Sequence, residues 1–167
     1  MTVDDLIARE EIHDVLKRLA RGTDRLDADL IISCYHPDGY DDHNTFRGSP
    51  DAFARWVCAV LPGFEATMHC IGAPLIALDG DTAQVNTYCV AHHLMGQGPH
   101  GARGDFVLGL RYVDRFERRN GRWLIAKRVC AFDWSYTVPI EGAPNAWFGE
   151  DFTVGARDRT DITYRGV

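Results

Sequence analysis

The sequence predicts a single α+β domain, a cone-shaped α+β barrel in which N-terminal helices pack on a strongly curved, mainly antiparallel sheet. Two observations predict this class. Residues 3–61 carry apolar side chains at helical spacing, whereas residues 65–134 alternate apolar and polar side chains at strand spacing. With 167 residues, the chain is also long enough to bury a core without disulfides or metal ions. A curved sheet closed on one side by helices leaves a pocket that suits a small molecule.

Composition narrows the range of partners and compartments. The formal net charge of -6 and the pI near 5.6 argue against a nucleic-acid partner, which requires a clustered basic surface. The N-terminus lacks the basic and apolar regions of a signal peptide, and no apolar run is long enough for a membrane span. We expect a cytoplasmic protein with a small hydrophobic ligand and no membrane partner. Neither a disulfide framework nor a zinc site is indicated by the five widely spaced cysteines, Cys34, Cys58, Cys70, Cys89 and Cys130.

The first helix is predicted over residues 3–21. Thr2 and Asp5 have the spacing of a capping box, with aspartate in the glutamate position. The apolar positions that follow repeat at helical spacing: Ile12, Val15, Leu16 and Leu19. Gly22 is the predicted stop. Asp24 follows it directly, at a junction between two helices where a side chain can point inward.

Two further helices complete the first half of the chain. A short amphipathic helix is predicted from Leu26 to Tyr35, ending at a turn over residues 36–39. Residues 40–46 are predicted as a short strand. Ser49 then caps a third helix with Pro50 at its first position, and this helix ends at residues 62–63.

The second half is predicted as a meander of antiparallel strands. They cover residues 65–78, 82–95, 105–117 and 122–134, joined by Asp79-Gly80, a glycine-rich loop near residues 96–101, and Asn120-Gly121. These elements define a domain over residues 1–135. The tail over residues 136–167 is rich in proline, glycine and aromatic residues, so we expect it to pack on the sheet or on a neighbouring subunit. The apolar surface left by the strands and tail predicts a homo-oligomer, a dimer or a trimer.

His69 is the first candidate catalytic residue. It lies in a predicted strand among apolar and small neighbours, where a lone histidine is usually only a satisfied core residue. Asp24 changes this interpretation, because its carboxylate could orient the imidazole. Histidine titrates near neutrality, and a carboxylate on one ring nitrogen fixes the tautomer so that the other nitrogen can accept a proton. A general base of this kind needs no nucleophile.

Strand parity indicates a second histidine. Alternate residues from 83 to 93 share one face of a strand, and the members before His93 are small, as expected beside a ligand. His93 is therefore favoured over His92, although a one-residue bulge would exchange the two. A solvated histidine at the end of a strand remains an alternative for His93.

The remaining candidates are weaker. Tyr35, Tyr40 and Tyr88 could each donate a hydroxyl to a substrate oxygen, although most tyrosines in such sheets only pack. Arg128 is a candidate for substrate binding, but a structural role is favoured in a cross-strand polar cluster with Arg111, Tyr112 and Asp114. No metal is predicted, because three adjacent residues on a strand, Asp41, Asp42 and His43, cannot all point one way. No cofactor is predicted either, since the sequence has no phosphate-binding loop and no dinucleotide fingerprint.

The Gly-Thr-Asp24 turn, the Met-His69-Cys-Ile-Gly strand and the closing hairpin at Asn120-Gly121 resemble the SnoaL-like branch of the nuclear transport factor 2-like superfamily. This resemblance covers residues 3–135 and implies the cone fold. The branch includes scytalone dehydratase and hexachlorocyclohexane dehydrochlorinase. In both lyases an aspartate at the end of the first helix and a histidine on the first long strand form the catalytic dyad, which implies these roles for Asp24 and His69. The dehydratase's second histidine matches His93.

Two positions depart from those lyases. Thr23 stands where the dehydratase has a substrate-contacting tyrosine, and Leu19 stands where the dehydrochlorinase has a lysine. Neither specific substrate is therefore implied. The resemblance implies a cofactor-independent lyase of the dehydratase type, or an isomerase, that acts on a small hydrophobic cyclic substrate by general-base proton abstraction. The alternative is a non-catalytic ligand-binding or assembly protein, such as a small subunit of a ring-hydroxylating dioxygenase, since one fold serves many functions.

Overall fold

The computed structural model describes residues 1–96, 103–142 and 147–166. The glycine-rich loop predicted near residues 96–101 therefore lies, from residue 97 onward, outside the described residues. The helices and strands, in chain order, are α1 (Val3–Asp24), α2 (Ala28–Ile32), β1 (Tyr35–Asp42), β2 (Arg47–Gly48), α3 (Pro50–Val60), β3 (Ala66–Ile71), β4 (Leu75–Asp79), β5 (Thr82–Met95), β6 (Gly104–Arg119) and β7 (Arg122–Pro139), with short 3-10 turns at Leu61–Gly63 and Ile162–Tyr164.

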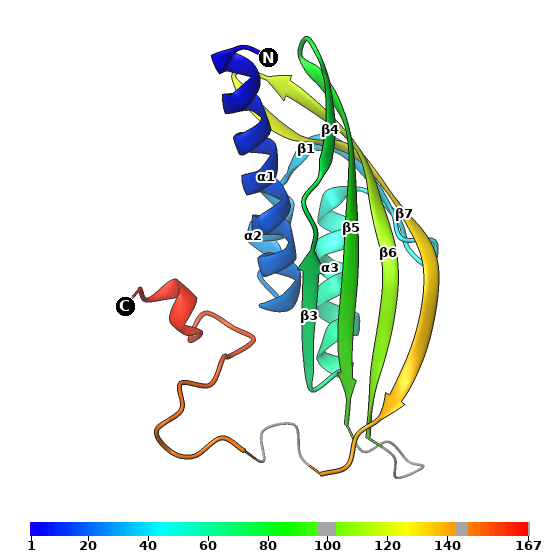
Figure 1. The fold of residues 1–167 in the computed structure, drawn as a ribbon, viewed down its shortest axis with the longest axis vertical. Helices are drawn as coiled ribbons and strands as arrows, with labels where there is room; N and C mark the ends of the chain where they lie inside the picture. The colour runs from blue at the N-terminus through cyan, green and yellow to red at the C-terminus, as the bar shows by residue number, and fades with distance from the viewer. Residues whose placement is uncertain (97–102, 143–146, 167) are drawn as a thin grey trace.

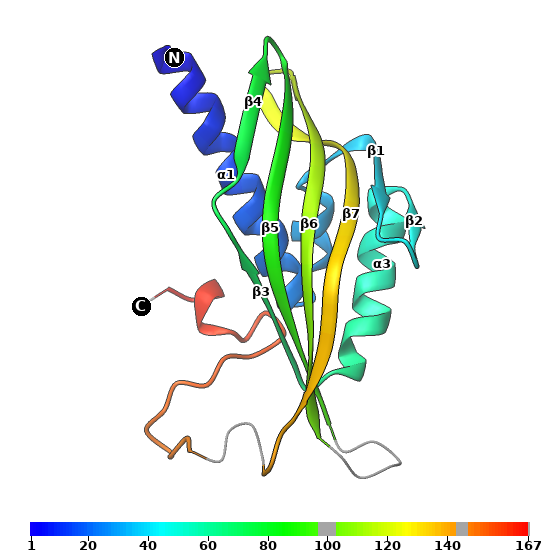
Figure 2. The same ribbon diagram turned by 45° about the vertical axis from the view of Figure 1, so that its right-hand side comes forward.

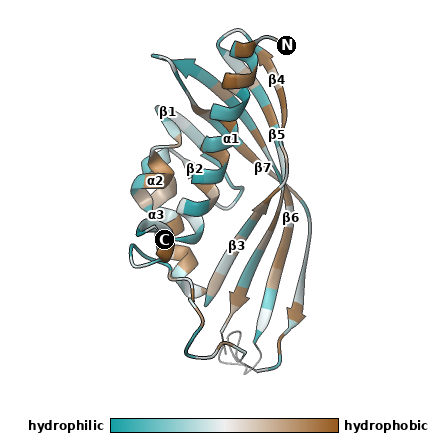
Figure 3. Cartoon of the chain, turned by 60° about the vertical axis from the view of Figure 1, so that its left-hand side comes forward, coloured by the Kyte–Doolittle hydropathy of each residue, from teal (hydrophilic) through white to brown (hydrophobic). Residues whose placement is uncertain are grey.

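The strands form one curved sheet, in the order β2-β1-β7-β6-β5-β3, and β4 pairs with β5 as well. The long strands β5, β6 and β7 are antiparallel, whereas β1 runs parallel to β7. The predicted α+β plan with a mainly antiparallel sheet is confirmed. All three α-helices named above lie on the concave side of the sheet (Figures 1 and 3).

Local sequence signals explain where the helices begin. Thr2 accepts a hydrogen bond from the Asp5 N–H, while the Asp5 carboxylate accepts one from the Thr2 N–H, so the predicted capping box is present. Ser49 caps α3, and Pro50 follows at its first position. The apolar faces of the helices then pack against the sheet in one core, whose fully buried members include Ile12, Ile31, Phe116 and Ile125.

The first helix is longer than predicted, because Gly22 does not end it. α1 continues to Asp24. A Cβ at Gly22 would lie 3.1 Å from the Ile31 side chain, so this glycine allows close packing between α1 and α2. Helical geometry therefore extends to Asp24 and turns its side chain toward the face that already buries Leu16 and Leu19.

The prediction for residues 33–39 was wrong. The second helix ends at Ile32, and Tyr35 begins strand β1 where a helix end and a turn were predicted. Parallel pairing with β7 draws this segment into the sheet, with Tyr35 opposite Ile125 and Tyr40 opposite Lys127. The register shifts between these pairs, at a point where a Cβ on Gly39 would lie 2.9 Å from the His36 carbonyl oxygen. A local turn signal was thus overridden by a strand partner far along the chain.

The strand boundaries also differ from the predicted ones. The segment predicted as one strand over residues 65–78 forms two, β3 and β4, and both pair with β5. Pro74 lies in the break between them and has no N–H to donate to a sheet. The last strand, β7, continues to Pro139, beyond the predicted end at residue 134.

The described part of the tail returns to the helices. Arg25 donates to the Ala156 carbonyl oxygen at 2.8 Å, and the Tyr164 hydroxyl donates to Asp27 Oδ2 at 2.8 Å. Figures 1 and 2 show this segment beside the C-terminal end of α1. It reaches the sheet through Arg157, which donates to Thr67 Oγ1 at 3.5 Å. Packing on a neighbouring subunit stays a prediction. Among the described residues, no helix combines the length and apolarity needed to cross a membrane.

Candidate active site

A cavity of about 630 Å³ lies between the helices and the concave face of the sheet. Most of its wall is apolar, with side chains from α1, α3 and the strands β5 to β7. The polar side chains that face it are few, as is usual for sites that bind small hydrophobic molecules. They are Thr23, His43, Asn44, Thr45, His69, His93, Tyr112 and Arg128.

Asp24 and His69 meet at the wall of this cavity. Asp24 Oδ1 lies 2.7 Å from His69 Nδ1, and Oδ2 accepts a hydrogen bond from the His69 main-chain N–H at 2.9 Å. The Thr67 hydroxyl donates to Asp24 Oδ1 at 2.9 Å. The carboxylate therefore holds both the backbone and the ring of His69. The spatial relationship expected from the sequence is present.

The charge state of Asp24 determines the tautomer of His69. Burial by itself raises the pKa of the Asp24 carboxyl, but the hydrogen bonds and charge of His69 and the hydrogen bond from Thr67 outweigh it, so the pKa lies below its usual value. An ionised carboxylate can only accept, so His69 Nδ1 carries the proton that it donates. His69 Nε2 is then free to accept a proton.

His93 lies beside His69, as strand parity predicted. The two rings are edge to face, with centroids 5.6 Å apart. His93 is 6% exposed and lines the cavity, whereas His92 bonds Asp105 outside it. β5 pairs with β6 in unbroken register around these residues, so no bulge exchanges the two histidines. Burial, and then repulsion from His69, lowers the pKa of His93, which favours its neutral form.

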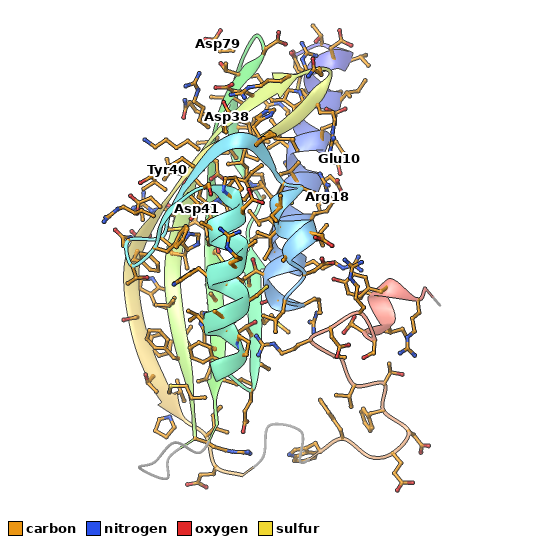
Figure 4. The ribbon with its side chains drawn as sticks, turned by 180° about the vertical axis from the view of Figure 1, so that it is seen from behind. Glu10, Arg18, Asp38, Tyr40, Asp41 and Asp79 are labelled. Carbon is orange, nitrogen blue, oxygen red and sulfur yellow. The ribbon has the colours of Figure 1, made fainter. Side chains whose placement is uncertain are left out.

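The other predicted substrate-binding residues separate into two groups. Arg128 lines the cavity, but two hydrogen bonds of 2.7 Å tie it to Asp114, which is the structural pairing that the sequence favoured. The three tyrosines lie away from the cavity. Tyr35 is buried and donates to Asp41, Tyr40 is partly exposed on β1 (Figure 4), and Tyr88 is exposed on the outer face of the sheet.

Sequence reasoning missed three cavity residues: His43, Trp56 and Tyr112. Trp56 was assigned to ordinary core, and His43 was considered only as a metal ligand. Phe53 and Trp56 share one helical face and follow His43 closely in the sequence, which was an available signal. In the structure these three rings form one aromatic group, with centroid distances of 4.6 to 6.1 Å.

No metal centre is apparent among the described residues. No group of three or more histidine, cysteine, aspartate or glutamate side chains converges there in an arrangement able to hold an ion. All five cysteines are free. The polar groups that line the cavity are imidazole, hydroxyl, amide and guanidinium groups.

Comparisons with known proteins agree with the fold described above. The SnoaL-like domain family matches residues 4–129. No curated protein matches. A putative scytalone dehydratase from Novosphingobium aromaticivorans superposes with a TM-score of 0.71 at 17% identity, covering 90% of this chain and 100% of that one. A hexachlorocyclohexane dehydrochlorinase superposes with a TM-score of 0.73 at 18% identity, covering 86% and 98%. The Kfla4162 protein from Kribbella flavida superposes with a TM-score of 0.72 at 17% identity, covering 79% of this chain and 95% of that one.

Proposed function

Because this chain belongs to the SnoaL-like domain family, we propose that it is a cofactor-independent lyase of the dehydratase type, or an isomerase, that acts on a small hydrophobic cyclic substrate. The observation that carries the proposal is the Asp24–His69 pair on the wall of an apolar cavity. Two proteins of similar fold bear the names of lyases, a putative dehydratase and a dehydrochlorinase.

His69 acts as the general base. Its Nε2 takes a proton from a carbon atom of the substrate, while Asp24 keeps Nδ1 protonated and stabilises the imidazolium that forms. The carbon's electron pair then forms the new double bond, and the leaving group departs or the proton returns at another carbon. His93, whose ring centroid lies 5.6 Å from that of His69, assists the leaving oxygen in an elimination.

The cavity selects the substrate by size and polarity. A volume of about 630 Å³ suits a compact molecule of one to three rings, and the aliphatic and aromatic wall favours one with little charge. Asp24 is buried beside His69, and a charge pair attracts more strongly where less water surrounds it.

The test is turnover of a panel of cyclic β-hydroxyketones and cyclic ketones. Elimination is followed by the ultraviolet absorbance of the enone, and proton abstraction without elimination by deuterium exchange in NMR spectra. We expect activity in the wild type and its loss in His69→Gln. His92→Gln is the matched control, because it removes the neighbouring histidine of β5 that lies outside the cavity.

Two outcomes would contradict the proposal. Activity that survives in His69→Gln would exclude this residue as the base. Tight binding of panel members without elimination or exchange in the wild type would favour the alternative, a ligand-binding or assembly protein that uses the same cavity. Assembly with a larger catalytic chain is the further mark of that alternative.

A further inference from the structure

A second histidine and aspartate pair faces the same cavity. His43 lies just after β1, and its Nδ1 bonds Asp41 Oδ1. Asp41 is fully buried, and its Oδ2 accepts a hydrogen bond from the Tyr35 hydroxyl at 2.6 Å. The His43 ring is stacked on Phe53, with centroids 4.6 Å apart. Because Asp41 engages Nδ1, Nε2 is the ring nitrogen of His43 left for a ligand.

The two pairs lie toward opposite sides of the sheet. β1 carries Asp41 and leads to His43, β3 carries His69, and strands β7, β6 and β5 lie between them. Figure 2 shows β1 and β3 on the two sides of these strands, and Figure 4 labels Asp41. Four strand spacings of about 4.8 Å separate β1 from β3 along the sheet, and the curvature of the sheet shortens the straight path between them. A ligand that touches both histidines must therefore extend across the cavity.

With Asp41 and Asp114 ionised and His43 neutral, the buried groups around His43 carry one uncompensated negative charge. Asp41 and Asp114 are two fully buried carboxylates, whereas Arg128 is one buried guanidinium. Burial, and then the charge of Asp41, raises the pKa of Tyr35 well above its usual value, so this phenol stays neutral. Burial likewise raises the pKa values of the other facing groups, Tyr112 and Cys130. An imidazolium at His43 supplies the missing positive charge, and an uncompensated buried charge is costly.

At the His69 end of the cavity, a different group offsets the charge of the buried carboxylate. Arg157 of the tail lies close enough to Asp24 to interact with its charge and contacts Thr67, which is hydrogen-bonded to that carboxylate. Arg25 has its own carboxylate partner, Asp161, at 3.5 Å. A guanidinium therefore already offsets the charge of Asp24. No second positive charge is needed beside Asp24, which suits the role proposed for His69.

We propose that His43 is an imidazolium that donates its Nε2–H to an oxygen of the substrate, at the end of the cavity opposite His69. The substrate class is then a hydrophobic ring system with a carbonyl oxygen conjugated to the reacting carbon. When His69 Nε2 takes the proton, the electron pair of the C–H bond moves onto that oxygen, and the His43 hydrogen bond stabilises the enolate. This step rests on the proposed function, whereas the binding of the oxygen by His43 does not.

The protonation of His43 is measured by long-range 15N–1H correlation spectra of the wild-type protein at pH 7, with signals assigned from His43→Gln and His69→Gln. We expect both ring nitrogens of His43 to be protonated, and only Nδ1 of His69. A neutral imidazole at position 43 would overturn the proposal. This readout needs no substrate and is independent of turnover.

The hydrogen bond is measured by calorimetric binding of 1-tetralone and of tetralin, which has the same rings without the oxygen. The wild type is expected to prefer the ketone about tenfold or more, as a hydrogen bond from a charged donor provides. His43→Phe should bind tetralin as tightly as the wild type does and should lose the preference for the ketone. Asp41→Asn should give the same result if it folds. His69→Gln should keep it.

The opposing results are equally specific. A wild type without preference for the ketone, or a His43→Phe variant that retains it, would overturn the assignment of His43. Loss of the preference in His69→Gln alone would place the oxygen at the other end of the cavity. Loss of turnover in His69→Gln together with an unchanged ketone preference in His43→Phe would leave the proposed function standing and remove only this inference.

Discussion

Asp24 bonds both the main-chain N–H and the imidazole of His69, at 2.9 and 2.7 Å. One carboxylate thus fixes the position of a strand and the tautomer of the ring that the strand carries. The imidazole is preorganised before any ligand enters, which is the condition that the proposed general base requires.

Asp24→Asn is expected to reduce kcat/KM by about 10²–10⁴, the usual contribution of general-base catalysis. The amide oxygen can accept a hydrogen bond from the His69 Nδ1–H, but it cannot stabilise the imidazolium by charge. Asp14→Asn, on an exposed part of the same helix, is the control. The measurement is steady-state kinetics on any substrate of the panel, and an unaffected rate would contradict the role of Asp24.

His93→Phe is expected to flatten the dependence of stability on pH between about 7 and 5. The depressed pKa of His93 means that the unfolded chain binds a proton in this range before the folded chain does, so stability falls as the pH drops below the ordinary histidine value of about 6.5. Phenylalanine fits beside Phe64 and Phe106, whose rings lie 5.0 and 6.0 Å from that of His93. Urea unfolding at several pH values gives the comparison, and equal slopes in variant and wild type would contradict the shift.

Asp114→Ala is expected to destabilise the fold by about 3–5 kcal/mol, because it leaves the buried Arg128 charge without its partner. Asp133→Ala is the matched control, since its pair with Arg111 also has two hydrogen bonds but is about one third exposed. That variant should lose far less stability, because water screens an exposed pair. Chemical denaturation measures both, and similar losses would show that burial does not govern the strength of these pairs.

Arg157→Ala is expected to release the tail and loosen the Asp24–His69 pair. Arg157 donates to the carbonyl oxygens of Leu61 and Phe64 at 3.1 and 2.6 Å, at the loop that leads into β3. Hydrogen exchange over residues 156–164 should rise, and kcat should fall several-fold. Arg159→Ala, which removes a largely exposed partner of Asp27, is the control. Unchanged exchange in Arg157→Ala would mean that the tail is held by its other contacts.

The sequence anticipated those parts of the fold that depend on local patterns. Helix caps at Thr2 and Ser49 and the alternation that turns His93 inward follow from neighbouring residues, and they were correct. The convergence of Asp24 with His69 was anticipated from the helix end and from the resemblance. Only the last residues of β1 were anticipated, within the strand predicted over residues 40–46. Its first residues were not, because His36-Pro37-Asp38-Gly39 has the composition of a turn and the strand partner lies in β7.

His43, the third histidine of the cavity, was missed for a related reason. Alternation argued against Asp41, Asp42 and His43 as one metal-binding group, because adjacent residues on a strand point to opposite faces. It could not show that a buried aspartate would orient the next histidine into a cavity, since this requires the position of α3 and the packing of Phe53 on the ring. Tertiary placement, rather than residue type, makes His43 a candidate.

The parallel pairing of β1 with β7 also has a consequence for how the protein is made. During translation, β1 emerges early and waits for a partner encoded about ninety residues later. Until the ribosome has released β7, the helices and β3 can assemble, but the cavity lacks the wall that carries Arg128. Contacts of such long sequence separation slow folding and leave an unpaired edge exposed in the nascent chain. A nascent chain arrested before β7 should therefore engage chaperones, whereas one that extends past residue 139 should not.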